Sequence, residues 1–280
     1  MNVLLIFSDQ HNPEFTGCYG GITRTPNIDR LASSGVRFNY AYSNCPVCVP
    51  SRASMYTGRY VHEIGCWDNA TPYDGILPNW VKHFGRCNVM TAVTGKLDFE
   101  EGIDPGFMEI MDVECRWKPD ITGLYRESVP TPGGKNYRGS KPRDPAIVLE
   151  HELRVTNNAI DWLKHRRPTD RSWVLSVHYI KPHPKWQPLP DLYEYYKGRI
   201  VRLPAKYYQR FEELNEVERA QSIYTNGYDC KDEELPGIHA AYHAVVEELD
   251  LYIGQILASL EELDMMKDTL IIYTSDHGEM

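Results

Sequence analysis

Five consecutive residues near the start of the chain, Cys48-Val49-Pro50-Ser51-Arg52, bring together a thiol, a hydroxyl and a guanidinium. They follow a polar, loop-like stretch and lead into residues 53–59, whose sequence predicts a short helix. A thiol just before a helix N-terminus faces unpaired backbone N–H groups, which favour negative charge and lower a cysteine pKa. Arg52 adds a permanently charged fork that suits oxyanions. The motif therefore predicts an anion site with a reactive side chain.

Two predicted strands, at opposite ends of the sequence, finish in an aspartate that is followed by a second potential metal ligand. Asp9-Gln10 follow the apolar run at 2–8, and Asp276-His277 follow the similar run at 269–274. Open α/β sheets place their chemistry beyond the carboxyl ends of the strands, where carboxylate and amide oxygens suit a hard divalent cation. An aspartate after a strand is by itself more often a cap or turn residue. It is the combination with Cys48 that predicts a metal site.

Strands and helices alternate along the chain. Further strands are predicted from apolar runs at 89–94 and 173–179, and helices from periodicity at 27–32, 78–86, 147–165 and 236–263. This alternation predicts an α/β fold with a central, mostly parallel sheet and helices on both faces. No domain boundary is evident, so residues 1–280 are interpreted as one catalytic domain. Two stretches without clear period, 115–146 and 181–235, are expected to be functional or mobile loops.

Composition narrows the class of protein. The net charge of −9 argues against a general nucleic-acid or membrane-surface binder, although a few placed cations can still bind an anionic substrate. Seven cysteines, an odd number without metal-finger spacing, argue against a disulfide framework. Cys45-x-x-Cys48 lacks the context of a thioredoxin-like redox pair. Because the sequence shows neither a signal peptide nor a membrane-spanning run, we expect a cytoplasmic protein; the oligomeric state stays open.

The cysteine motif resembles a family signature. Cys-x-Pro-Ser-Arg followed by Thr-Gly-Arg is typical of type I sulfatases, within the alkaline phosphatase superfamily, and Thr57-Gly58-Arg59 supply the second part here. In that family the cysteine is oxidised to formylglycine before folding. The resemblance implies a hydrolase of sulfate esters, with a small anionic ester as substrate and a formylglycine-generating enzyme as maturation partner.

The resemblance also implies the ligands of a divalent metal, with calcium as the first candidate and magnesium or manganese as alternatives. These ligands are Asp9, Gln10, Cys48, Asp276 and His277.

Further roles around the nucleophile follow from the same resemblance. Gly95-Lys96-Leu97-Asp98 is similar to the family's Gly-Lys-Trp-His segment, whose lysine contacts the sulfate. Arg52 and Lys96 are thus expected to stabilise the transferring group. Asp98 stands where the family has a histidine, which leaves open the base that releases sulfate. His183 is the expected acid for the leaving oxygen, whereas His178, inside a strand, is interpreted as a packed core histidine.

Three residues are expected to line the substrate pocket: Asn69, Asp98 and His62. For His62 a structural role is equally compatible with the sequence.

Several branches of the family and one rival class remain open. Asp9-Gln10 and Asp276-His277 favour the branches of phosphonate monoester hydrolases and choline sulfatases, so phosphonate or phosphate ester hydrolysis is the alternative function. The segment at 95–98 and Ala41-Tyr42-Ser43-Asn44 resemble arylsulfatase K-like enzymes, which act on sulfated uronates. Family members continue beyond residue 280 with a smaller C-terminal subdomain and a second sulfate-binding lysine. We therefore expect a C-terminally truncated chain, and an inactive fragment is the rival hypothesis.

Overall fold

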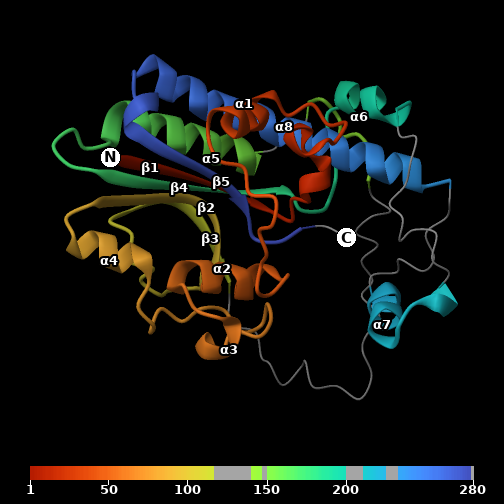
Figure 1. Ribbon diagram of the computed structural model, residues 1–280, viewed down its shortest axis with the longest axis horizontal. Coiled ribbons are helices and arrows are strands. Elements are labelled where there is room, and N and C mark those ends of the chain that lie inside the picture. Colours follow the sequence, from red (N-terminus) through yellow and green to blue (C-terminus); the bar gives the residue numbers. More distant parts are fainter. Residues whose placement is uncertain (117–139, 147–149, 200–210, 225–232, 279–280) are drawn as a thin grey trace.

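The computed structural model describes residues 1–116, 140–146, 150–199, 211–224 and 233–278 (Figure 1). The strands are β1 (Asn2–Asp9), β2 (Met90–Glu100), β3 (Glu109–Arg116), β4 (Trp173–Pro182) and β5 (Thr269–Ser275). The α-helices are α1 (Pro26–Ser34), α2 (Cys48–Thr57), α3 (Val61–Ile64), α4 (Trp80–Arg86), α5 (Glu150–Asp161), α6 (Pro190–Lys197), α7 (Glu216–Tyr224) and α8 (Leu235–Glu262). A π-helical turn, η4 (Trp162–Arg166), continues α5.

The described strands form one sheet in the order β3-β2-β4-β1-β5, and all neighbouring strands run parallel. The central strands β1 and β4 have continuous apolar sequences because both of their faces are covered. Their carboxyl ends lie side by side, since Asp9 pairs with Pro182. The predicted α/β class with a mostly parallel sheet is therefore confirmed.

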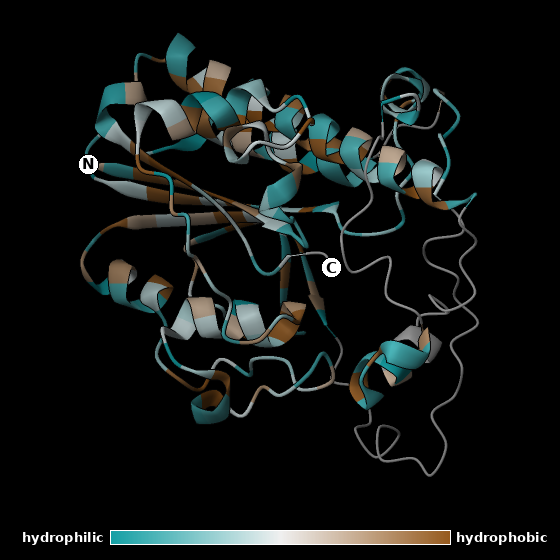
Figure 2. Ribbon diagram, turned by 45° about the vertical axis from the view of Figure 1, so that its right-hand side comes forward, coloured by the Kyte–Doolittle hydropathy of each residue, from teal (hydrophilic) through white to brown (hydrophobic). Residues whose placement is uncertain are grey.

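Helices cover both faces of this sheet, as predicted. In Figure 1, α1, α5 and α8 lie on one side, and α2 and α4 on the other. Leu4 of β1 belongs to the same core cluster as Leu249 of α8, whereas Val93 of β2 packs in a second cluster with Tyr56 of α2. Figure 2 shows the central strands mostly in the hydrophobic colours, between helices that mix both colours. The sheet thus separates two apolar cores.

Several boundaries differ from the predictions. β2 extends to Glu100, so residues 95–99 lie inside the strand rather than after it. β3 was not predicted, because an edge strand exposed in part alternates charged and apolar residues instead of showing a continuous apolar run. The stretch at 181–235, predicted to be irregular, contains α6 and α7. Of the stretch at 115–146, residues 115–116 end β3 and residues 117–139 lie outside the described residues.

Within the described ranges, no helix combines the length and the apolar composition that a bilayer crossing requires.

Candidate active site

The cysteine motif forms the first turn of α2. Cys48 is the first residue of this helix, and not the residue before it as predicted; Val47 is the N-cap with extended backbone. Asn69 Oδ1 accepts a hydrogen bond from the backbone N of Val49 at 3.1 Å, which satisfies an N–H without an intrahelical partner. Gly58, in the left-handed region at φ 66°, ends the helix. The start of α2 therefore presents Cys48 in a defined orientation, with Asn69 beside it.

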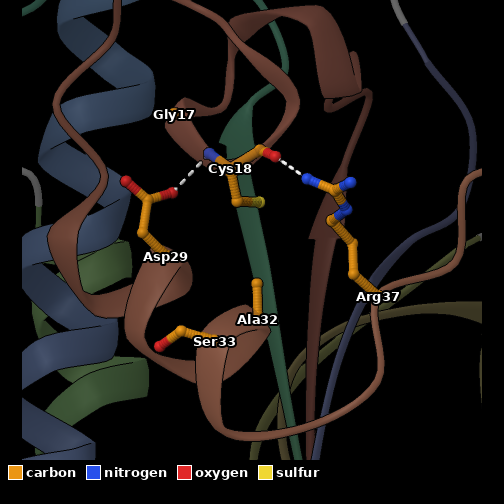
Figure 3. A pocket seen from close by; sticks show the side chains of 6 residues that line it. All are labelled: Gly17, Cys18, Asp29, Ala32, Ser33 and Arg37. Atoms are coloured by element: carbon orange, nitrogen blue, oxygen red, sulfur yellow. Dashed lines mark hydrogen bonds between the residues drawn. The ribbon is translucent and has the colours of Figure 1, made fainter.

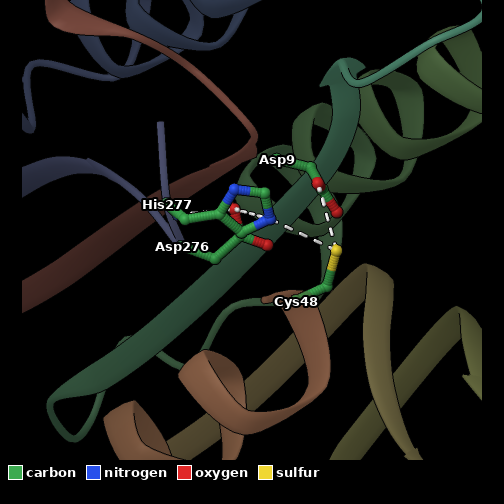
Figure 4. A group of neighbouring side chains, drawn as sticks. All are labelled: Asp9, Cys48, Asp276 and His277. Atoms are coloured by element: carbon green, nitrogen blue, oxygen red, sulfur yellow. Dashed lines mark hydrogen bonds and ion pairs between the residues drawn. The ribbon is translucent and has the colours of Figure 1, made fainter. Parts of the chain in front are cut away.

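Four potential metal ligands meet where β1, β5 and α2 converge (Figure 4). Asp9, Cys48, Asp276 and His277 each offer one ligand atom, and these atoms all lie within 4.8 Å of one another. Cys48 Sγ lies 3.6 Å from Asp9 Oδ1 and 3.4 Å from His277 Nε2. Because β1 and β5 pair in parallel, their carboxyl ends bring the two aspartates to the same edge of the sheet. The fold thus assembles this quartet from both ends of the sequence.

Gln10, the fifth expected ligand, contacts the quartet through its backbone. Its N–H donates to Asp276 Oδ1 at 3.0 Å, and its carbonyl accepts from the Tyr242 hydroxyl at 2.7 Å. Its φ of 64° lies in the left-handed region, which turns the chain sharply after β1. Gln10 therefore links the end of β1 to β5 and to α8; its role as a metal ligand stays a prediction.

Arg52 is fully buried and bridges two carboxylates of the quartet. Its Nη2 lies 3.1 Å from Asp9 Oδ2 and 2.9 Å from Asp276 Oδ2. Its Nη1 donates to the carbonyl of Lys96 and, at 3.3 Å, to Nδ1 of His178. This contact requires an unprotonated Nδ1, and burial together with the Arg52 charge lowers the pKa of His178 well below its ordinary value. His178 is thus confirmed as a buried core histidine.

Lys96 provides the second buried cation. Its ammonium forms an ion pair with Asp9, and its Nζ lies 3.3 Å from Asp98 Oδ2. Burial alone would lower the pKa of Lys96, but the charges of Asp9 and Asp98 outweigh burial and raise it. Lys96 therefore carries a positive charge at neutral pH.

The two aspartates of the quartet differ in acidity. Burial raises the pKa of both, but at Asp9 the charges of Arg52, Lys96 and His183 outweigh burial and hold the pKa at about 2. At Asp276, burial and the nearby Asp9 charge outweigh Arg52, so its pKa is raised. Asp9 is thus the stronger acid of the two.

The Cys48 thiol contradicts the expected reactive thiolate. Burial, followed by the charge of Asp9, raises its pKa to about 12, despite the helix N-terminus and Lys96. Burial, together with a charged neighbour within a few ångströms, here outweighs the partial charges of a helix end. At neutral pH Cys48 is therefore a protonated thiol, which is a poor nucleophile.

The remaining predicted site residues lie outside the quartet. His183 follows β4, and its Nδ1 donates to the carbonyl of Pro184 at 2.7 Å, which leaves Nε2 for proton exchange. Its charge contributes to the lowered pKa of Asp9, so its ring lies in the neighbourhood of that carboxylate. His62 is exposed on α3, where its ring stacks on Tyr60. The assignment of Asn69, Asp98 and His62 to a substrate pocket stays a prediction.

Two neighbours of the site were missed in the sequence. Tyr242, on α8, fixes the turn after β1, and Arg116, the last residue of β3, bonds Asp98 Oδ1 at 2.8 Å through Nε. Tyr242 carries no sequence signal of this role, because it lies within the apolar stripe of a helix. Arg116 would have been identified by its place at the carboxyl end of a strand, had β3 been predicted.

A separate hollow of about 340 Å³ lies by α1 (Figure 3). It is lined by Gly17, Cys18, Asp29, Ala32, Ser33 and Arg37. Asp29 accepts from the backbone N of Cys18 at 2.7 Å, and Arg37 donates to the carbonyl of Cys18. Both charged side chains that line the hollow thus form hydrogen bonds with the backbone of this loop, so they have a structural role there.

Comparisons with known proteins show which proteins this chain resembles in sequence. The sulfatase family model matches residues 1–280. Arylsulfatase K of Canis lupus familiaris is 28% identical over 295 residues, covering 100% of this chain and 53% of that protein. Choline-sulfatase of Rhizobium meliloti (strain 1021) is 27% identical over 304 residues, covering 100% of this chain and 57% of that protein. The chain thus spans about half the length of the curated relatives it matches.

A similar fold is found among solved structures. The phosphonate monoester hydrolase of Agrobacterium radiobacter matches with a TM-score of 0.76 and 24% identity, covering 99% of this chain and 62% of that one. At this level of identity the match establishes a shared fold.

Proposed function

The chain belongs to the sulfatase family, and on this premise we propose that its site hydrolyses sulfate esters through a formylglycine derived from Cys48. One observation carries the proposal: Cys48 begins α2 with Sγ 3.6 Å from Asp9 Oδ1 and 3.4 Å from His277 Nε2. Residue 48 is thus a member of the potential metal quartet itself. The proposed partners are a small anionic ester and a formylglycine-generating enzyme.

The chemistry of the donor set supports the metal that the family implies. Asp9 and Asp276 offer oxygens, which hard cations prefer, whereas the Cys48 thiol and His277 suit softer ions such as zinc. Replacing the sulfur by the oxygens of a hydrated aldehyde makes the set rich in oxygen. The quartet, with Gln10, would then hold calcium, magnesium or manganese, and the ion would supply Lewis acidity to the nucleophile and the ester oxygens.

The other residues of the site have distinct roles in this proposal. Residue 48, once converted to formylglycine, would supply a hydroxyl of its hydrate as the nucleophile for sulfur, and the bond from sulfur to the leaving oxygen would break. Arg52 bridges Asp9 and Asp276 and so fixes the separation of the two carboxylates. Lys96, held in its charged form, stabilises the charge of the transferring group. His183 gives a proton from Nε2 to the leaving oxygen.

Hydrolysis of phosphonate monoesters on the same scaffold is the second candidate. Two observations favour it: Gln10 and His277, rather than Asp and Asn, follow the two aspartates, and a phosphonate monoester hydrolase shares the fold. Both candidates use the same quartet and the same cations, so they differ in substrate preference and not in the residues required.

The test uses the 280-residue chain produced together with a formylglycine-generating enzyme. Mass spectrometry of the peptide that contains Cys48 should show the aldehyde, and the protein should cleave aryl sulfates or choline sulfate faster than phosphonate monoesters. Cys48→Ala should abolish turnover, whereas the matched variant Cys45→Ala should keep it. An unmodified thiol, combined with no turnover, contradicts the proposal. Faster cleavage of phosphonate monoesters favours the second candidate.

A further inference from the structure

Arg116 is an accessible cation at the edge of the site. It is the last residue of β3, and so lies at the same carboxyl edge of the sheet as Asp9. Its side chain is 34% exposed, compared with 0% for Arg52 and 8% for Lys96. Among the residues that the structure describes, its guanidinium forms one side-chain hydrogen bond, from Nε to Asp98 Oδ1 at 2.8 Å. Among the described side chains, the two Nη groups therefore have no partner and are available as donors.

Asp98 connects Arg116 with the two buried cations. Its Oδ2 lies 3.3 Å from Lys96 Nζ and 3.8 Å from Arg52 Nε, and within the described part of the chain this buried oxygen has no hydrogen-bond donor of good geometry. Asp98 has a φ of 59° inside β2, where the pairing with β3 becomes irregular. A non-glycine residue keeps this strained backbone only where its surroundings hold it. Here, three cations surround the carboxylate.

Arg116 adds a third cation beside Asp98, on its more exposed side. Lys96 and Arg52, which approach Asp98 Oδ2, also form ion pairs with Asp9 and, for Arg52, with Asp276. An unbalanced carboxylate at the position of Asp98 would repel an anionic ester. The ion pair with Arg116 balances this charge.

We propose that Arg116 is a substrate-binding residue, held through Nε by Asp98 so that its Nη groups donate to an anionic oxygen of the ester. A guanidinium fork suits sulfate and carboxylate oxygens equally well. The oxygen belongs either to the sulfate or to a second acidic group of the substrate, and the recognition chemistry is the same. The inference deepens the proposed function and rests on it for the kind of ligand.

The test measures binding and does not require turnover. The full 280-residue chain is titrated in calcium-containing buffer with inorganic sulfate, phenyl sulfate and 4-carboxyphenyl sulfate. Arg116→Gln should weaken binding about tenfold, and Arg116→Lys should recover part of the loss. The matched control, Arg154→Gln, removes an exposed pair of 2.7 Å with Asp112 of the same strand and should leave binding unchanged.

The change in affinity for each of the three probes identifies the substrate oxygen that Arg116 contacts. An equal loss for all probes supports a contact with the sulfate, and a loss confined to 4-carboxyphenyl sulfate supports a contact with a second acidic group. Wild-type affinity in Arg116→Gln overturns the proposal, as does an absence of sulfate binding by the unsubstituted chain. Thermal unfolding is recorded for every variant. If Arg116→Gln does not fold, unchanged affinity in Arg116→Lys overturns the proposal instead.

A double variant separates direct contact from charge balance. If Arg116 acts only by neutralising its partner, Asp98→Asn combined with Arg116→Gln should restore binding, and this result overturns the proposal. Persistent weak binding supports direct contact. A chain that binds sulfate through Arg116 but cleaves no ester contradicts the proposed hydrolysis while supporting this inference.

Discussion

Arg52 Nε lies 3.0 Å from Asp276 Oδ2, although the two residues are 224 positions apart in the sequence. The neighbouring Ser51 donates from Oγ to the backbone carbonyl of Asp276 at 2.6 Å. These two contacts bind the first turn of α2 to the end of β5. The position of Cys48 relative to the other three residues of the quartet therefore depends on a buried ion pair between residues far apart in the sequence.

Arg52→Lys tests this dependence. An ammonium keeps the charge but cannot bridge Asp9 and Asp276 as the planar fork does, so we expect calcium affinity to fall by about 10- to 100-fold. The free energy of unfolding should fall by about 3 kcal/mol, because one buried carboxylate loses its partner. Calorimetry and urea denaturation measure the two effects. In the control Arg30→Lys, at an exposed pair with Glu261, both quantities should stay near wild type; unchanged calcium affinity in Arg52→Lys would contradict the bridging role.

His183→Gln tests the proposed acid. Glutamine cannot give up a proton, so cleavage of an alkyl sulfate, with a poor leaving group, should slow by about 10²- to 10⁴-fold. Cleavage of 4-nitrophenyl sulfate should slow far less, because its leaving group departs without protonation. Steady-state kinetics on both esters measure the difference, and His165→Gln, at an exposed position, serves as control. Equal slowing of the two esters would rule out His183 as the acid.

Glu248→Gln tests a buried cluster of charges between α8 and the end of β4. Glu248 Oε2 lies 3.2 Å from Lys181 Nζ and 3.0 Å from Arg143 Nη1, so removal of its charge leaves two buried cations without their shared partner. We expect the free energy of unfolding to fall by about 3–5 kcal/mol. Glu262→Gln, at an exposed pair of 2.6 Å with Lys164, should cost about 0.5 kcal/mol or less. Urea denaturation compares the two variants, and equal losses would refute the importance of the cluster.

Stability should depend on pH through His243. Burial, followed by the charge of His239, lowers its pKa from 6.5 to about 4. The unfolded chain binds a proton below pH 6.5, whereas the folded chain does so only near pH 4. The contribution of neutral His243 to the free energy of unfolding is therefore fully present above pH 6.5. As pH falls towards 4 the free energy of unfolding decreases by an amount on the order of 3 kcal/mol.

Urea denaturation at several pH values measures this effect. The loss of stability between pH 7 and pH 4.5 should be smaller in His243→Gln than in the unsubstituted chain. The control His83→Gln, at an exposed histidine, should keep the original pH dependence. An identical dependence in all three proteins would show that His243 is not responsible.

The sequence by itself determined those features whose signal is local. Apolar runs predicted four of the five described strands, since a strand covered on both faces must be apolar along its length. The Cys48 motif, and an aspartate after each of two strands, predicted the members of the quartet, because residues after parallel strands meet at one edge of the sheet.

Tertiary structure decided the properties that depend on distant neighbours. The helix start predicted a reactive thiol at Cys48, but burial, followed by the charge of Asp9, raises its pKa to about 12. The place of Arg116 beside Asp98 follows from the pairing of β3 with β2, and β3 carries no continuous apolar signal. The pKa of a group depends on its burial and on all the charged groups that the fold brings near it. A local sequence pattern can therefore identify the reacting residues but not their acidity or their partners.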